Sequence, residues 1–187
     1  ATRERTFYGS LAMASLGYKY NPKFDLPEYD INLLKKITKH RGGIRALALI
    51  EVNEYHKAAR EFRKIIPKFD VKDYPQLLSF ISKNNMPGLT FRLAAILRND
   101  YDQIHLGGLY PIPSWKMDTS DLKDKALVYA IARQESGFNP RAKSSSKAMG
   151  VLQIIPSTAA FIMKNREYRL RRSKNHLLYN PPHNIHI

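Results

Sequence analysis

The chain reads IARQESGFNP over residues 131–140 and AMGVLQIIPSTA over residues 148–159. The first stretch closes a helical pattern that begins near residue 120 or 121, runs to about Glu135 and gives way to a turn. The second stretch contains a short apolar run, after which Pro156 opens another helix that is predicted to end near residue 164. The sequence therefore predicts a carboxylate at the end of one helix, followed by a turn, an apolar run and a second helix.

Glu135 is the most informative residue of the first stretch. Leu127 and Ile131 lie eight and four positions before it, so the three side chains are predicted to share one apolar helical face. Burial and the negative end of the helix dipole would both favour the neutral carboxyl, which is the form that a general acid needs. The alternative is that Glu135 forms an ion pair with Arg133 or Arg141, or accepts a hydrogen bond from a backbone amide.

Both stretches resemble the conserved motifs of lytic transglycosylases of the soluble murein type. LYNP at residues 178–181 and Asn184-Ile185 resemble a further segment of that family, and YPIP at residues 110–113 resembles the start of its catalytic domain. By motif position, the resemblance makes Glu135 the catalytic residue. It assigns to the substrate cleft Ser136, Met149, Gly150 and Gln153.

The resemblance implies an activity on peptidoglycan glycan strands in the periplasm, with no metal and no cofactor. A single Glu would protonate the leaving oxygen of the β-1,4 bond between N-acetylmuramic acid and N-acetylglucosamine, and would then deprotonate the muramoyl 6-hydroxyl to give a 1,6-anhydro sugar. The sequence is consistent with catalysis by a single carboxyl group, because Glu167 is the only acidic residue after Glu135. Ordinary glycosidases use two carboxyl groups. A second carboxylate at Asp118, Asp121 or Asp124 is the open alternative.

The predicted fold is mainly α. Residues 1–112 are expected to form a superhelical, linker-type α-helical domain, with helices separated by breakers such as Gly42-Gly43 and Pro87-Gly88. Residues 107–115, with two glycines and two prolines, are predicted to be a non-helical linker. Residues 113–187 are expected to form the N-terminal part of a lysozyme-like catalytic domain.

The family's third motif, Ala-Tyr-Asn, does not occur after Asn184-Ile185 in this chain. The resemblance therefore predicts a chain that stops inside the catalytic domain, with little activity of its own and some exposed apolar surface. The alternative function is a catalytically incomplete helical module that binds peptidoglycan or acts as a scaffold.

The net charge of +15 calls for an anionic partner such as nucleic acid, an acidic membrane or an acidic polymer. Residues 126–187 hold ten Lys and Arg against two Glu, a net +8, and the densest run extends from Arg166 to Lys174. The chain has no recognition motif for nucleic acid, no apolar run long enough to span a bilayer, no export signal and no cysteine. The charge is therefore assigned to a solvated surface or to contact with the cell-wall polymer.

Overall fold

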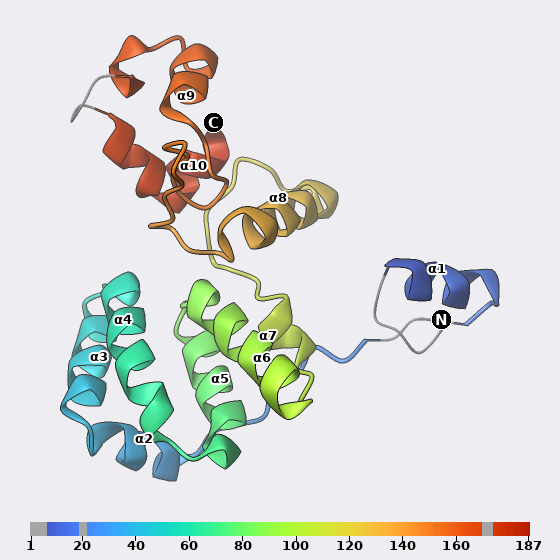
Figure 1. Cartoon of the computed structure of the whole chain (residues 1–187), viewed down its shortest axis with the longest axis vertical. Helices are drawn as coiled ribbons and strands as arrows, with labels where there is room; N and C mark the ends of the chain where they lie inside the picture. The colour runs from blue at the N-terminus through green and yellow to red at the C-terminus, as the bar shows by residue number, and fades with distance from the viewer. Residues whose placement is uncertain (1–6, 19–21, 170–173) are drawn as a thin grey trace.

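The structure is a computed structural model that describes residues 7–18, 22–169 and 174–187. Within these ranges all regular elements are helices, and the extended pairing consists of two isolated bridges, from Met149 to Lys143 and to Ile154. The mainly α fold predicted from the sequence is thus confirmed (Figure 1). The elements are α1 (Phe7–Ser15), α2 (Ile31–Thr38), α3 (Arg41–Glu51), α4 (Tyr55–Ile65), η1 (Ile66–Lys68), η2 (Val71–Asp73), α5 (Tyr74–Lys83), α6 (Pro87–Tyr101), α7 (Leu106–Leu109), α8 (Leu122–Ser136), α9 (Pro156–Ile162), η3 (Arg166–Tyr168), η4 (Asn175–Tyr179) and α10 (Pro181–His186).

The helices from α2 to α7 form one part of the molecule, in which α3 packs with α4 and α5 packs with α6 (Figure 1). Asp30 starts this part by capping α2, since its side chain accepts hydrogen bonds from two backbone N–H groups of the first turn at 3.0 and 3.1 Å. The helices share one apolar core around Phe62, Leu77, Leu78 and Leu93, whose side chains are almost fully buried. Burial of each such side chain contributes roughly 1.5–3 kcal/mol.

Two glycine pairs that were expected to interrupt helices lie inside them instead. Gly42-Gly43 occupies the first turn of α3, where a Cβ on Gly43 would lie 2.0 Å from the carbonyl oxygen of Ile37. The predicted linker likewise begins as the short helix α7, in which a Cβ on Gly108 would lie 2.7 Å from the Cβ of Ala94. In both places glycine permits close packing of neighbouring helices, and this gain outweighs its low helix propensity.

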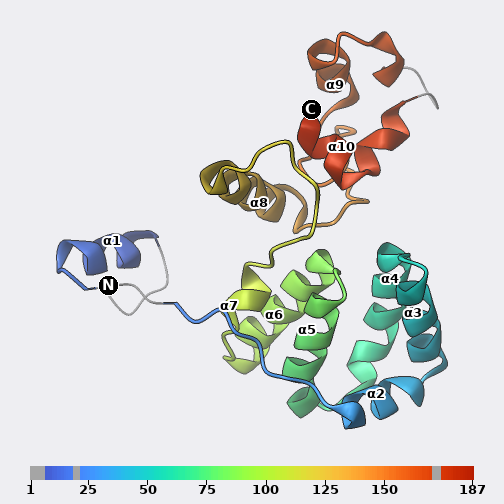
Figure 2. The ribbon, with the colours of Figure 1, turned by 180° about the vertical axis from the view of Figure 1, so that it is seen from behind.

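Residues 116–187 form a second part that lies against the ends of α4 and α6 (Figure 2). One small core lies around Ala159 and Leu178, and another combines Ala132, Phe138 and Val151. In the described residues, no helix has both the length and the apolar character needed to cross a bilayer. The division of the chain near residue 112 remains a prediction.

Arg133 joins the two parts. Its Nε donates a hydrogen bond to the carbonyl oxygen of Leu109 at 3.0 Å, and its guanidinium lies 4.9 and 4.8 Å from the ring centroids of Phe91 and Tyr110. Beside it, a Cβ on Gly88 would come within 3.0 Å of the carbonyl oxygen of Phe138. These contacts fix the C-terminal half of α8 on the start of α6.

The basic run from Arg166 to Lys174 is described only in part, because residues 170–173 lie outside the described ranges. Arg166 and Arg169 are exposed, and Lys174 forms an ion pair with Glu167 at 2.7 Å. The described portion of the run is therefore a solvated surface.

Candidate active site

Glu135 lies in the last turn of α8. Asp121 begins this helix as predicted, with its side chain accepting a hydrogen bond from the backbone N–H of Lys123 at 2.7 Å. Gly137 ends the helix in the left-handed conformation, with φ of +56°, and its N–H donates to carbonyl oxygens of the final turn. The helix therefore fixes the backbone position of Glu135, which is the residue before the last one of α8.

The expected burial of Glu135 is wrong, because its side chain is exposed. The apolar residues assigned to the same face are exposed as well: Leu127 is 61% and Ile131 is 39% exposed. The buried face of α8 instead contains Ala132, which is fully buried. Ala132 follows Ile131 by one residue, so the buried face is turned by one residue from the predicted one. Apolar residues occur on both faces of α8, so the 3.6-residue period did not identify the buried one.

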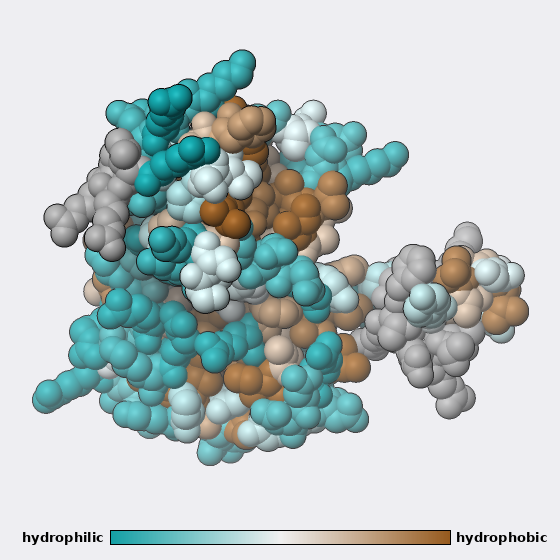
Figure 3. Space-filling model, turned by 45° about the horizontal axis from the view of Figure 1, so that its top comes forward, coloured by the Kyte–Doolittle hydropathy of each residue, from teal (hydrophilic) through white to brown (hydrophobic). Residues whose placement is uncertain are grey.

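Exposed apolar side chains on this part of the molecule extend beyond α8. Leu122 is 79% exposed near the start of α8, and Phe161 and Ile162 are 80% and 49% exposed at the end of α9. Apolar residues gather on the upper part of the molecule in the space-filling view (Figure 3). Exposed apolar side chains therefore occur along α8 and at the end of α9.

Ser136 connects the two motifs. Its hydroxyl lies 2.8 Å from the carbonyl oxygen of Val151 and 3.0 Å from that of Ala132, so one O–H donor is shared between the second motif and its own helix. The hydrogen bond to Val151 therefore positions the loop that follows α8. Its predicted contact with a substrate is not tested by this geometry.

The second motif folds as a tight hairpin. Met149 and Ile154 exchange backbone hydrogen bonds at 3.0 and 3.1 Å, and Gln153, at φ of +50°, donates from Nε2 to the carbonyl oxygen of Gly150 at 2.9 Å. Gly150 has φ of +80°, and a Cβ there would lie 2.0 Å from the carbonyl oxygen of Leu178, so this position requires glycine. Gln153 is partly exposed, whereas Met149 is 6% exposed and packs in the core with Ala159.

Asn184 holds this hairpin in place, a role that the sequence did not reveal. The side chain is fully buried on α10. Its Oδ1 accepts a hydrogen bond from Leu152 N–H at 2.8 Å, while its Nδ2 donates to the carbonyl oxygens of Met149 and Leu178 at 3.0 and 2.9 Å. The available signal was the Asn-Ile segment of the family resemblance, which indicated that the residue matters without showing why.

No group of three or more His, Asp or Glu side chains is arranged to hold a metal ion in the part of the chain that the structure describes. The histidines near the C-terminus have other partners: His183 stacks on Tyr168 and shares a hydrogen bond with its hydroxyl at 2.7 Å, and His186 pairs with Asp118. Partial burial, followed by the charge of His186, lowers the pKa of His183, which favours the neutral imidazole.

Comparison with known proteins finds similar sequences and folds. The Transglycosylase SLT domain matches residues 116–187. The soluble lytic murein transglycosylase of Salmonella typhimurium is 28% identical over 189 residues, which is 99% of this chain and 28% of that protein. The chain thus spans less than a third of the length of this curated relative.

Solved structures have the same fold. The 70 kDa soluble lytic transglycosylase from Escherichia coli superposes with a TM-score of 0.70 at 24% identity, over 98% of this chain and 29% of that one. An inactive Glu-to-Gln mutant of the lytic transglycosylase Slt from Pseudomonas aeruginosa superposes with a TM-score of 0.69 at 22% identity, over 97% and 30%. Residues 116–187 therefore match the model of the Transglycosylase SLT domain, and the whole chain is similar in sequence and fold to soluble lytic murein transglycosylases.

Proposed function

We propose that the protein is a lytic transglycosylase that cleaves the β-1,4 bond between N-acetylmuramic acid and N-acetylglucosamine in peptidoglycan strands without water. One observation carries the proposal: within the segment that matches the SLT domain, the end of α8 that bears Glu135 is bound through Ser136 to the hairpin of the second motif. The relatives named as murein transglycosylases support peptidoglycan as the substrate and, with it, a periplasmic location.

In this reaction Glu135 acts twice. Its carboxyl first donates a proton to the glycosidic oxygen as the bond from that oxygen to the anomeric carbon breaks. The carboxylate then takes the proton of the muramoyl 6-hydroxyl, whose oxygen forms the new bond to the anomeric carbon. The products are a free 4-hydroxyl and a 1,6-anhydromuramoyl end, no water is consumed, and the carboxyl is protonated again.

The positions of the other carboxylates support a mechanism with one acid. Two-carboxylate glycosidases hold the pair within roughly 5–9.5 Å. Asp121 and Asp124 lie at the opposite end of α8 from Glu135, which at 1.5 Å per residue puts their backbones about 21 and 16 Å away. Asp118 is in contact with the ring of His186, and Glu167 forms an ion pair with Lys174, so both carboxylates already have partners.

The test is digestion of purified peptidoglycan by this chain, with mass spectrometry of the soluble products. We expect a small yield of soluble muropeptides, in line with the low activity predicted for this chain, each lighter by one water than the products of hydrolysis. Glu135→Gln should lower the rate by roughly 10²–10⁴-fold, the usual range for loss of a general acid–base. Glu167→Gln, a change of the same type at an exposed glutamate of the same segment, should keep the wild-type rate.

Two outcomes would contradict the proposal in different ways. Products that end in reducing muramic acid would rule out the transglycosylase reaction. An unchanged rate in the Glu135→Gln variant would exclude this glutamate as the catalyst, whatever the products are.

A second candidate function is a peptidoglycan-binding or scaffold module without catalysis. The exposure of Glu135 and of the neighbouring Leu127 and Ile131 favours it, because a general acid normally works in a site that excludes water. Under this alternative, the chain would sediment with insoluble peptidoglycan, release no soluble product, and bind equally well after Glu135→Gln.

A further inference from the structure

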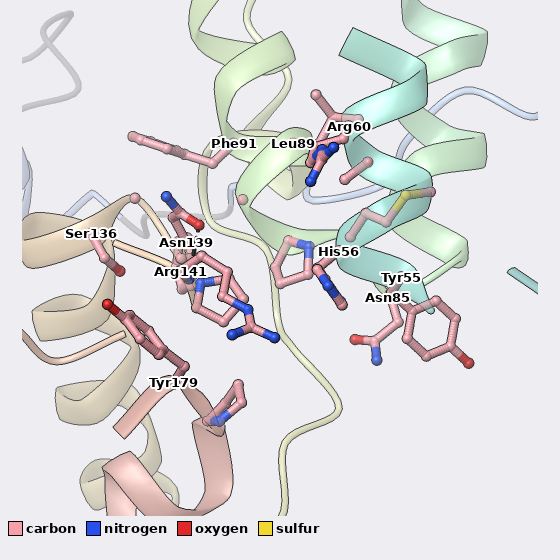
Figure 4. Close-up of a pocket in the computed structure, with 18 of the residues that line it drawn as sticks. Tyr55, His56, Arg60, Asn85, Leu89, Phe91, Ser136, Asn139, Arg141 and Tyr179 are labelled. Carbon is pink, nitrogen blue, oxygen red and sulfur yellow. Dashed lines mark hydrogen bonds between the residues drawn. The ribbon is translucent and has the colours of Figure 1, made fainter. Parts of the chain in front are cut away.

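The helix α4 lies between two cavities. At its first turn, Tyr55 and His56 face the cavity that the helical part shares with residues 116–187, the SLT part (Figure 4). At its last turn, Lys64 and Ile65 line a second cavity of about 430 Å³. We call it the α3 cavity, because the start of α3 also lines it. All its lining residues lie between positions 39 and 68, so the α3 cavity belongs to the helical part alone.

The α3 cavity lies far from the proposed catalytic residue. It is formed where the end of α2 meets the start of α3, the last turn of α4 and the 3₁₀ helix η1. In Figures 1 and 2, α2 lies at the end of the helical part that faces away from α8, α9 and α10. A ligand of this cavity would therefore bind without contact with the SLT part.

The lining of the α3 cavity is strongly positive. It includes five Lys and Arg side chains, whereas Glu61 is the single acid among the lining residues. Glu61 is only 13% exposed and already has partners, since it accepts hydrogen bonds from Arg45 Nη2 and from Lys64 Nζ, each at 2.6 Å. The carboxylate therefore holds two cations beside the cavity and is itself neutralised by them.

Three further cations of the lining have no acidic partner. Lys39 follows the last residue of α2, Arg41 is the first residue of α3, and Lys68 is the last residue of η1. All three are exposed, and none forms an ion pair within the described residues. Their charges come from three different elements and are available to an anion.

The backbone that carries these cations is held in place by close packing. A Cβ on Gly42 in α3 would lie 2.9 Å from Cγ2 of Ile65 in α4, and Ile65 is 3% exposed. The elements around the cavity therefore have little freedom to move apart. Keeping like charges around one cavity costs free energy when no anion is bound, and a bound anion would remove this cost.

The size and the charges of the cavity favour a phosphate monoester. Typical small-molecule sites measure roughly 300–1,000 Å³, a range that includes this cavity. A phosphate monoester carries nearly two negative charges and three strong acceptor oxygens, so it can pair with several cations at once, and lysine binds phosphate as a point charge. A nucleic acid fits less well, because the one ring in the lining, His40, packs on Phe69 with 5.3 Å between ring centroids and leaves little surface for base stacking.

We propose that the α3 cavity binds a phosphate monoester group, with Lys39, Arg41 and Lys68 as its direct partners. Arg45 and Lys64, which Glu61 holds in place, add to the positive field of the site. The phosphate belongs either to a small soluble molecule or to a lipid headgroup. The site would give the helical part a binding function of its own, beyond the reaction proposed for the SLT part.

The experiment titrates glycerol phosphate into the whole chain at constant ionic strength and measures the heat of binding, with acetate as the comparison anion. We expect saturable binding of glycerol phosphate that is at least about tenfold tighter than that of acetate, because acetate has a single charge and two oxygens. A second arm measures sedimentation of the chain with phosphatidylcholine vesicles prepared with and without phosphatidic acid, whose headgroup is a phosphate monoester.

Four exposed lysines provide a matched pair of double variants. Lys39 and Lys68 line the cavity, whereas Lys35 on α2 and Lys123 on α8 lie outside it. Lys39→Gln with Lys68→Gln should weaken phosphate binding at least about tenfold. Lys35→Gln with Lys123→Gln lowers the net charge of the chain equally and should leave binding unchanged. Circular dichroism of each variant establishes that it is folded.

The two arms separate the sources of the phosphate. Binding that is lost in the cavity variant and kept in the control variant supports the inference, with glycerol phosphate identifying a soluble ligand and the vesicles a lipid headgroup. Equal affinity for acetate, equal loss in both double variants, tighter binding of an oligonucleotide, or no binding in either arm would overturn it. Neither arm involves peptidoglycan, so this inference and the proposed function can fail separately.

Discussion

Replacing Asn184 with alanine should destabilise the SLT part by about 3 kcal/mol. The side chain is fully buried and makes three hydrogen bonds, to Leu152 N–H and to the carbonyl oxygens of Met149 and Leu178. Each such bond contributes about 1 kcal/mol net, and its loss leaves a buried backbone group without a partner. A domain with a total stability of roughly 5–15 kcal/mol would lose a large fraction of it.

Urea unfolding followed by the fluorescence of Trp115 measures this effect, since Trp115 packs on Phe138 in the SLT part. Asn184→Asp should destabilise at least as much: the carboxylate can still accept from Leu152 N–H, but it cannot donate to the two carbonyl oxygens and carries a buried charge. The matched control is Asn99→Ala, an exposed asparagine, with an expected change within about 0.5 kcal/mol. If Asn184→Ala also falls within about 0.5 kcal/mol of the wild type, the hydrogen bonds do not hold the hairpin, and the reasoning is wrong.

Substitutions at Gly150 and Glu61, with Gly17 as a control, test two further features of the structure. Gly150→Ala should lower the free energy of unfolding in urea by more than about 2 kcal/mol. A left-handed backbone costs an alanine roughly 1–2 kcal/mol, and the added Cβ would also clash with the carbonyl oxygen of Leu178. Gly17→Ala has a similar φ of +74° but no atom within 4 Å, so it should show only the backbone cost, and equal effects would contradict the steric argument. Hydrogen bonds from Lys64 and then from Arg45 lower the pKa of Glu61 in the folded protein. The ionised carboxylate therefore stabilises the fold at pH values above its unfolded-state pKa of about 4.3. This stabilisation is lost as the pH falls through the lowered pKa of the folded protein. Glu61→Gln should therefore lower the urea midpoint at pH 7 and leave it unchanged below that lowered pKa; an equal loss at both pH values would exclude the ion pairs as the cause.

Local signals were sufficient to predict several elements. Asp121 caps α8 through a hydrogen bond to a residue two positions away, and Pro156 begins α9 because its fixed φ suits a first helical turn. Leu89, Leu93 and Leu97 repeat at helical spacing and are all buried in α6. In each case the interaction that forms the helix involves residues of that helix or of one of its faces. The spacing of residues along the chain is therefore enough to predict it.

The features that the sequence did not predict depend on contacts between distant residues. The hydrogen bonds of Asn184 to Met149 and Leu152 span more than thirty positions, and one cavity brings arginines of α4 and α6 together with Arg141 beyond α8. No described residue of the densest basic run, Arg166 to Lys174, lines that cavity, so charge density along a chain does not show which side chains converge in space. The glycine pairs lie inside helices rather than between them for a related reason, since only the neighbouring helix shows that Gly43 allows a close approach.

The exposure of Glu135 follows from the way α8 divides its last turn among three neighbours. Ala132 packs into the core with Phe138, Arg133 bonds to Leu109 in the helical part, and Ser136 bonds to Val151 in the second motif. These side chains occupy the inward faces of the last turn, and the two residues between them, Gln134 and Glu135, are exposed. The contacts of Ala132, Arg133 and Ser136 fix the backbone of this turn in three directions. The backbone that bears Glu135 is therefore held in place although its side chain is exposed, and a fixed backbone is one part of the positioning that general acid catalysis would require.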